Sequence, residues 1–282
     1  MTPTPDYLLI GHITADLTSE GRALGGTVSY AARVAHAFGF PVAALTSAAV
    51  DEPLLAELAP YADVTSFPAA VTSTFENVYA PDGLRTQYVR GVANRLTADL
   101  LPSAWRAAPL VHLAPLTDEV DPSIAREFPD STVMLTPQGW FRRWDADGRV
   151  GFKRWFDRSI LRSVHIVVFS EHDIQDAPEL EQQFVSSVEH VIVTKGARGG
   201  TYYHHGTPSD YGTPQVETVE PTGAGDVFAA SLLSSLQFVE DMDTAIRVAA
   251  RLGATAVTRS GLQGTPTGAE VMQAIAAAQV QP

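Results

Sequence analysis

The sequence predicts an α/β fold with a mostly parallel central sheet, for two reasons. Short, continuously apolar segments alternate along the chain with longer segments of helical periodicity. Strands that are apolar on both faces are typical of a parallel sheet that helices cover on both sides. The chain has 282 residues, of which 45% are hydrophobic, so it can bury one large layered core. We therefore expect one domain that spans residues 1–282.

Six segments are predicted to be strands of this sheet. Each is short and apolar, and turn-forming or polar residues bound it. They are Tyr7–Ile10, Pro41–Leu45, Leu110–Ala114, Thr132–Thr136, Val164–Phe169 and His190–Thr194. Gln215–Val219 is strand-like as well. Residues 74–90 differ, because two segments of alternating polarity flank Pro81-Asp82-Gly83, which predicts a hairpin that forms a small flap.

Five segments are predicted to be helices. In Thr27–Phe38 the apolar side chains recur on one face, and Gly39 then ends the run. The other four are residues 176–187, 223–238, 242–259 and 267–280. Their alternation with the strands supports the α/β prediction.

Composition excludes several classes of protein. Lys and Arg total 19 against 32 Asp and Glu, a net charge of −13, and no basic block is present, so neither nucleic acid nor an anionic membrane is an expected partner. No apolar run is long enough to span a bilayer, and the N-terminus lacks a signal-peptide pattern. We expect a soluble, cytoplasmic protein. The absence of cysteine excludes thiolate chemistry, and the eight histidines show no H-x-x-x-H spacing, so no structural zinc site is expected.

The segment T-G-A-G-D at residues 222–226 carries the strongest chemical signal. It opens a helix whose apolar residues recur every four positions. At a helix N-terminus, backbone N–H groups and the helix dipole favour an anion, and small residues let a phosphate approach the main chain. The same positive end favours the ionised form of Asp226, which suits a base that takes a proton from a hydroxyl. This combination is what phosphoryl transfer to an alcohol requires.

A tight turn with an acidic first-turn residue is the simpler interpretation of these five residues. Two other phosphate-binding motifs are excluded. A G-x-G-x-x-G dinucleotide fingerprint needs a small residue where the chain has Phe228, and a Walker A sequence is absent.

The segment 222–226, followed by V-F-A-A-S-L-L, resembles the C-terminal signature of the ribokinase-like, or PfkB-type, carbohydrate kinases. Four further segments resemble that family in its order. They are G-H-I-T-A-D at residues 11–16, the pair Gly25-Gly26, T-K-G-A-R-G at residues 194–199 and A-V-T-R-S-G at residues 256–261. The resemblance thus covers nearly the whole chain. It implies a three-layer sandwich with a reduced β lid from about residues 17–24 and 74–90.

The resemblance also implies roles for individual residues. Asp226 would be the general base, and the backbone amides of Gly223, Ala224 and Gly225 would form the anion hole for the transferred phosphoryl group. Thr194, Gly196 and Gly199 would border the nucleotide, although a hairpin turn explains them too.

Substrate binding is implied for residues nearer the N-terminus. Asp16 would accept hydrogen bonds from two substrate hydroxyls, with a turn-capping surface residue as the alternative. Gly25 and Gly26 would let the substrate lie against the backbone, or would simply begin a helix. Gln138 is a pocket candidate on other grounds, because its segment follows a predicted strand at the carboxyl edge where open α/β sheets bind ligands.

Two positions depart from the family's pattern. S-E-H-D at residues 170–173 stands where the family has an N-x-x-E motif tied to magnesium, so Asp173 is predicted either to hold a metal or to cap a helix. Tyr30 stands where many members carry a sugar-binding asparagine. An aromatic side chain there indicates stacking on a ring and argues against ribose or fructose. The segment G-G-T-V-S-Y is loosely similar to plant inositol kinases.

These observations predict an ATP-dependent, magnesium-requiring kinase that phosphorylates a hydroxyl of a small sugar, polyol or inositol-like compound. Activation by a monovalent cation and assembly as a monomer or a homodimer both stay open. Two alternatives remain. One is a nucleoside kinase of the same fold, and the other is a catalytically silent nucleotide- or sugar-sensing protein.

Overall fold

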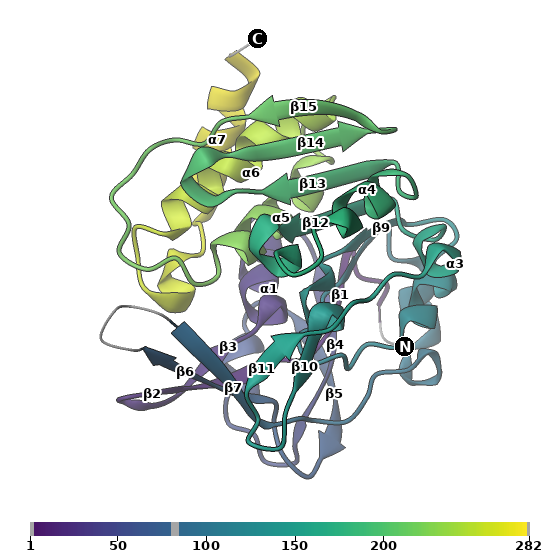
Figure 1. Ribbon diagram of the computed structural model, residues 1–282, viewed down its shortest axis with the longest axis vertical. Coiled ribbons are helices and arrows are strands. Elements are labelled where there is room, and N and C mark those ends of the chain that lie inside the picture. Colours follow the sequence, from purple (N-terminus) through teal and green to yellow (C-terminus); the bar gives the residue numbers. More distant parts are fainter. Residues whose placement is uncertain (1–2, 80–84, 281–282) are drawn as a thin grey trace.

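The computed structural model of the protein describes residues 3–79 and 85–280 (Figure 1). Its centre is a nine-stranded sheet of order β15-β14-β13-β12-β9-β8-β1-β4-β5. The strands are parallel except at one edge, where β14 and β15 form an antiparallel hairpin after β13. The α/β prediction with a mostly parallel sheet is confirmed.

The strands of the central sheet include all six predicted segments. They are β1 (Tyr7–Ile10), β4 (Val42–Ala49), β5 (Asp63–Ala69), β8 (Leu110–Leu113), β9 (Thr132–Leu135), β12 (Ile166–Ser170), β13 (His190–Thr194), β14 (Gly200–His204) and β15 (Thr207–Tyr211).

The prediction of a strand at Gln215–Val219 is wrong. These residues form an exposed loop, in which Val216 and Val219 are 43% and 63% exposed. The backbone N–H of Val219 donates to the carbonyl of Val257 at 2.8 Å, beyond the end of a helix. The segment therefore runs past the sheet without pairing with it.

The predicted helices are present, most of them shortened at their ends. The α-helices are α1 (Thr27–Ala37), α2 (Leu55–Leu58), α3 (Arg158–Leu161), α4 (Glu179–Val185), α5 (Ala224–Ser235), α6 (Met242–Ala256) and α7 (Gly268–Val280). Short 3₁₀ helices are η1 (Ala98–Leu100), η2 (Ser103–Ala107), η3 (Pro122–Glu127), η4 (Pro137–Phe141), η5 (Glu171–Ile174), η6 (Gly196–Arg198) and η7 (Gly261–Gly264).

The central sheet separates two apolar cores. Side chains alternate between the faces of a strand, so Tyr7 and Leu9 join one core, whereas Leu8 and Ile10 join the other. Helices α1, α5, α6 and α7 supply the first core, and α3, α4 and several 3₁₀ helices supply the second. This division explains why the strands are apolar at every position, and it makes a three-layer sandwich.

A second sheet lies beside the central one and contains both predicted lid segments. Its order is β3-β2-β6-β7, and its strands are β2 (Thr14–Thr18), β3 (Gly21–Gly25), β6 (Thr74–Tyr79) and β7 (Arg85–Gly91). The predicted turn Pro81-Asp82-Gly83 lies outside the described residues. A ribbon of β10 (Arg142–Trp144) and β11 (Val150–Phe152) contacts β7 through a bridge between Tyr88 and Arg149.

Polar residues and proline mark both edges of the central sheet. The edge strand β15 carries Pro208 and Asp210, and its residues are exposed except for Tyr211, which is partly buried. The opposite edge strand, β5, carries Asp63 and Pro68. Within the described part of the chain, no helix is both long enough and apolar enough to cross a bilayer.

Replacing Phe184 with alanine is expected to destabilise the protein strongly. The Phe184 side chain is fully buried, and its ring centroid lies 5.4 Å from that of Phe169 and 5.9 Å from that of Phe141. Such a cavity costs about 3–5 kcal/mol in the free energy of unfolding. Equilibrium urea unfolding measures this loss. The control is Met272→Ala, because Met272 is 63% exposed and its loss should cost less than about 0.5 kcal/mol. Equal effects of the two substitutions would contradict the packing described.

Candidate active site

A cavity of about 470 Å³ lies between the two sheets. Thr136, Ser170 and Thr194 line it at the carboxyl ends of the neighbouring strands β9, β12 and β13. The four-stranded sheet contributes Asp16 and Phe75 from the other side. This is the edge at which open α/β sheets bind ligands, because polar loop residues converge there.

The turn before α5 brings glycine backbone to the cavity. Gly223 has a φ of +81°, and a Cβ on it would lie 2.2 Å from Cε1 of Tyr30, so only glycine fits there. A Cβ on Gly225 would meet no atom within 4 Å, because this residue faces open space in the cavity. The N–H of Ala224 donates to the carbonyl of Pro221 at 3.3 Å, a long bond that closes the turn. All three residues line the cavity.

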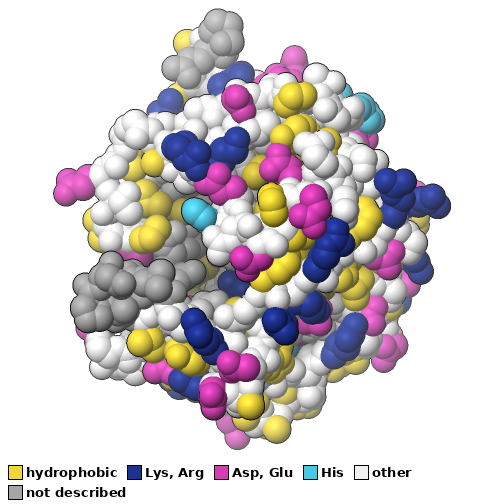
Figure 2. Space-filling model, viewed as in Figure 1, with side chains coloured by type: hydrophobic (Ala, Val, Ile, Leu, Met, Phe, Trp, Pro, Cys, Tyr) yellow, Lys and Arg dark blue, Asp and Glu magenta, His cyan; other side chains and the backbone are white. Residues whose placement is uncertain are grey.

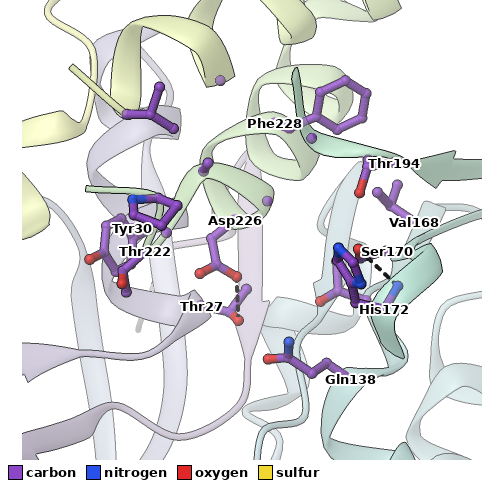
Figure 3. Close-up of a pocket in the computed structure, with 18 of the residues that line it drawn as sticks. Thr27, Tyr30, Gln138, Val168, Ser170, His172, Thr194, Thr222, Asp226 and Phe228 are labelled. Carbon is purple, nitrogen blue, oxygen red and sulfur yellow. Dashed lines mark hydrogen bonds between the residues drawn. The ribbon is translucent and has the colours of Figure 1, made fainter. Parts of the chain in front are cut away.

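Asp226 lies in the first turn of α5 and points into the cavity (Figure 3). Its Oδ1 accepts a hydrogen bond of 2.7 Å from Oγ1 of Thr27, the first residue of α1. The pKa of Asp226 is raised to about 6, mainly by burial. The Thr27 bond and the charge of Arg142 oppose this rise, and the carboxylates of Asp173 and Asp16 add to it. The helix N-terminus alone suggested an easily ionised carboxylate, but burial outweighs that effect.

Asp16 faces the cavity from β2 and is held by its own strand. Its Oδ1 accepts a hydrogen bond of 2.9 Å from Oγ1 of Thr14. Burial raises the pKa of Asp16, and the positive charge of Arg142 lowers it. Gly26 lines the cavity, whereas Gly25 is not among the described lining residues and instead lies behind Asp16, since a Cβ on it would be 2.2 Å from Oδ2 of Asp16.

Asp173 has partners that belong to a helix cap. Its Oδ2 accepts from the backbone N–H of Ser170 at 2.9 Å, and the Ser170 hydroxyl accepts from the backbone N–H of His172 at 3.2 Å, which completes a capping box. Its Oδ1 accepts from Nε2 of Gln138 at 3.1 Å. Asp173 thus caps the helix η5, which is one of the two roles predicted for it. Asp173 also lines the cavity, with lone pairs left on both oxygens.

The far end of the cavity is apolar and bounded by glycines. Thr194, Gly196 and Gly199 line it after β13. The φ of Gly199 is +81°, and a Cβ on it would lie 1.9 Å from the carbonyl oxygen of Tyr211. The Tyr211 ring stacks on Phe228 with centroids 5.8 Å apart. Small and apolar residues complete this end, namely Val216, Ala250, Gly253, Ala254 and Val257.

Tyr30 lines the cavity but is only 5% exposed. Its ring packs against Gly223, and burial is the main reason that its pKa is raised. In the structure the ring thus supports the glycine turn. Figure 3 places Tyr30 and Thr222 on one side of Asp226, with Ser170, His172 and Gln138 on the other.

Sequence reasoning missed the hydroxyl partners of the two cavity carboxylates. The sequence indicates Thr27 only as the start of a helix, and Thr14 has no predicted role. A hydroxyl directly after the Gly25-Gly26 pair was the available signal for Thr27. For Thr14 the signal was its position two residues before Asp16, which puts both side chains on one face of a strand.

Replacing Thr27 with valine is expected to raise the pKa of Asp226. The Thr27 hydroxyl stabilises the ionised carboxylate, so its loss leaves burial and the neighbouring carboxylates less opposed. Carboxyl-carbon NMR titration of Asp226 measures the shift. Thr27→Ser keeps the hydroxyl and serves as the control. An unchanged or lowered pKa in Thr27→Val would contradict the role assigned to this bond.

The known proteins to which this chain is similar in sequence include several kinases. Residues 158–268 match the family model of the pfkB family carbohydrate kinases. The chain is 27% identical over 257 residues to the inositol 3-kinase of Zea mays. The alignment covers 90% of this chain and 65% of that enzyme. It is 28% identical to the fructokinase of Escherichia coli over 187 residues, 58% of this chain and 59% of that enzyme. The chain thus spans less than two thirds of each of these relatives.

The fold is also found among solved structures. A pyrophosphate-dependent kinase in the ribokinase family, complexed with a pyrophosphate analog and myo-inositol, superposes with a TM-score of 0.80 over 95% of this chain and 99% of that one, at 17% identity. The structural likeness shows the ribokinase fold, and the family match agrees with it. Residues 158–268 thus match the pfkB family of carbohydrate kinases, and the chain has the ribokinase fold.

Proposed function

We propose that the protein is an ATP-dependent kinase that phosphorylates a hydroxyl of a small sugar, polyol or inositol-like compound. One observation carries the proposal. One cavity is lined by the partly buried carboxylate of Asp226, by a glycine turn open to an anion and by a second carboxylate, Asp16, suited to hydroxyl groups. The match of residues 158–268 to the pfkB family model and the similarity to an inositol 3-kinase and a fructokinase support it.

Asp226 and Asp16 have different roles toward the acceptor substrate. Asp16 accepts hydrogen bonds from substrate hydroxyls and fixes the ring. Asp226 accepts the proton of the attacking hydroxyl. The hydroxyl oxygen of the substrate bonds to the transferred phosphorus, while the bond between that phosphorus and the oxygen that leaves with ADP breaks. The raised pKa of Asp226 suits this step, because a base is most effective when its pKa is near the working pH. Activity is then lost as the pH falls through about 6 and Asp226 is protonated.

The glycine turn serves the donor. The cavity beside Gly225 is open, so the backbone amides of this turn would hold the transferred group as its charge spreads over the equatorial oxygens. The apolar lining residues, Ala254 and Val257 among them, would pack against an adenine base. Inorganic pyrophosphate has no apolar group that would contact them, which favours ATP as the donor.

A divalent cation is needed on electrostatic grounds. Asp16, Asp173 and Asp226 line the cavity that must admit a polyanionic donor, and close like charges repel strongly where water is scarce. Mg²⁺ prefers carboxylate oxygens together with phosphate groups. Asp173 is the residue that would hold it, through the lone pairs that its cap leaves unused. Bound there, the ion would supply positive charge that offsets the charge of the phosphate groups.

The proposal predicts ADP release from Mg·ATP with one class of acceptor. A panel of inositols, linear polyols, hexoses, pentoses and nucleosides should give turnover with inositols or related polyols. Asp226→Asn should lower kcat by roughly 10²–10⁴-fold with little change in ATP affinity, because it removes the base and keeps the shape. Asp243→Asn is the matched control, since Asp243 is an exposed carboxylate in the first turn of α6.

Two outcomes would contradict this assignment. ATP binding without turnover of any acceptor would indicate a sensor, and preferred turnover of nucleosides would indicate a nucleoside kinase. Pyrophosphate assayed in place of ATP tests the choice of donor.

Gly225→Ala tests the anion-binding role of the turn without disturbing the fold. The added methyl meets no protein atom, so the melting temperature should not change, but the methyl occupies space open to the phosphoryl group. Turnover is expected to fall by roughly 10²-fold, the usual effect of losing one such donor. Gly151→Ala on β11 is the control, because a Cβ there also meets no atom within 4 Å. Full activity in Gly225→Ala would exclude this turn as the phosphoryl site.

A further inference from the structure

Four side chains meet at the end of β13 and β14 that faces away from the cavity. Glu189 precedes β13, and His190 begins it. His190 pairs directly with His204 across the two antiparallel strands, and their rings stack with centroids 5.0 Å apart. His205 follows in the turn to β15. Thr194 at the cavity is four residues from His190, or about 13 Å along the strand.

The ring nitrogens of the three histidines surround one carboxylate oxygen. From Oε1 of Glu189, Nε2 lies at 3.5 Å in His190, 3.8 Å in His204 and 3.4 Å in His205. The ligand atoms of Glu189, His190 and His204 all lie within 4.8 Å of one another.

The spacing of Glu189, His190 and His204 fits ligands around one ion, and His205 lies close enough to Glu189 to complete the set once its exposed side chain moves. A charge-assisted hydrogen bond would bring nitrogen and oxygen to about 2.7–2.9 Å, and none of the three pairs is that close. Ligands bonded to zinc at about 2.1 Å in a tetrahedron stand about 3.4 Å apart. The nitrogen-to-oxygen distances lie close to this value, so a central ion needs only small movements of exposed side chains.

Neighbouring groups hold the cluster in place. Nδ1 of His190 is 2.8 Å from the hydroxyl of Tyr202, and a metal-bound imidazole commonly uses its second nitrogen in this way. The backbone N–H of His205 donates to the carbonyl of Glu189 at 2.9 Å, and the left-handed φ of 47° at His205 tightens this turn. Glu189, His204 and His205 are exposed, so an ion has direct access from solvent.

We propose that Glu189, His190, His204 and His205 form a surface site for a divalent transition metal, with Zn²⁺ as the best-fitting ion. Imidazole nitrogens with one carboxylate are a zinc ligand set, whereas Mg²⁺ prefers oxygen ligands throughout. The site is separate from the kinase cavity and does not depend on the proposed function. Sequence spacing did not reveal it, because strand pairing joins ligands 14 residues apart.

Isothermal titration calorimetry of the untagged protein with ZnCl₂ tests the proposal. Excess Mg²⁺ is present to occupy carboxylate sites in the cavity. We expect one Zn²⁺ per chain, and Glu189→Gln, His204→Ala and His205→Ala should each weaken binding by at least about 10-fold. His36→Ala is the matched control, because His36 is an exposed histidine on α1, and it should bind Zn²⁺ as the parent does.

A second readout guards against misfolded variants. Without Zn²⁺, each variant should melt at the temperature of the parent, since the altered side chains are exposed. Zn²⁺ should raise the melting temperature of the parent and of His36→Ala, and should raise that of the three site variants less, because a ligand that binds the folded state stabilises it. Absence of Zn²⁺ binding, or equal affinity in the parent and all three site variants, would overturn the proposal.

Discussion

The hydrogen bond between Thr27 and Asp226 is the contact on which the candidate site depends. It joins the first turns of α1 and α5, whose residues lie 199 positions apart in the sequence. The two helices meet this closely because glycines precede both, and Gly223 accepts the Tyr30 ring where any side chain would clash. The same contact sets the protonation of the carboxylate, since the Thr27 hydroxyl opposes the effect of burial. One hydrogen bond thus both positions the Asp226 side chain and affects its pKa.

Charge in the cavity is balanced only in part. Among the described residues, three carboxylates line it, and Arg142 is close enough to lower the pKa of both Asp16 and Asp226. The chain as a whole carries a net charge of −13. An anionic donor therefore meets an unfavourable field unless a cation accompanies it. The proposed requirement for Mg²⁺ follows from this arrangement independently of any relative.

Local features of the structure were predictable from sequence, and contacts between distant residues were not. The bounds of β1 and β13 match the prediction, because continuous apolar runs reflect burial on both faces of a strand. The glycine turn before Asp226 was predictable as well, because the apolar periodicity of the following residues indicates a helix that begins there. The Thr27 bond, the contact of Asp173 with Gln138 and the pairing of His190 with His204 each depend on where separate elements pack. The loop at Gln215–Val219 shows the opposite error, because a strand-like pattern forms no strand without a neighbour to pair with.

The prolines on the two edge strands affect how this protein can associate. An edge strand offers unpaired backbone groups to which a strand of another molecule can add, and that addition begins many aggregates. Proline has no N–H to donate, and Pro208 on β15 and Pro68 on β5 each interrupt the row of donors. The neighbouring aspartates add charge to both edges. Both ends of the central sheet thus resist the addition of a further strand.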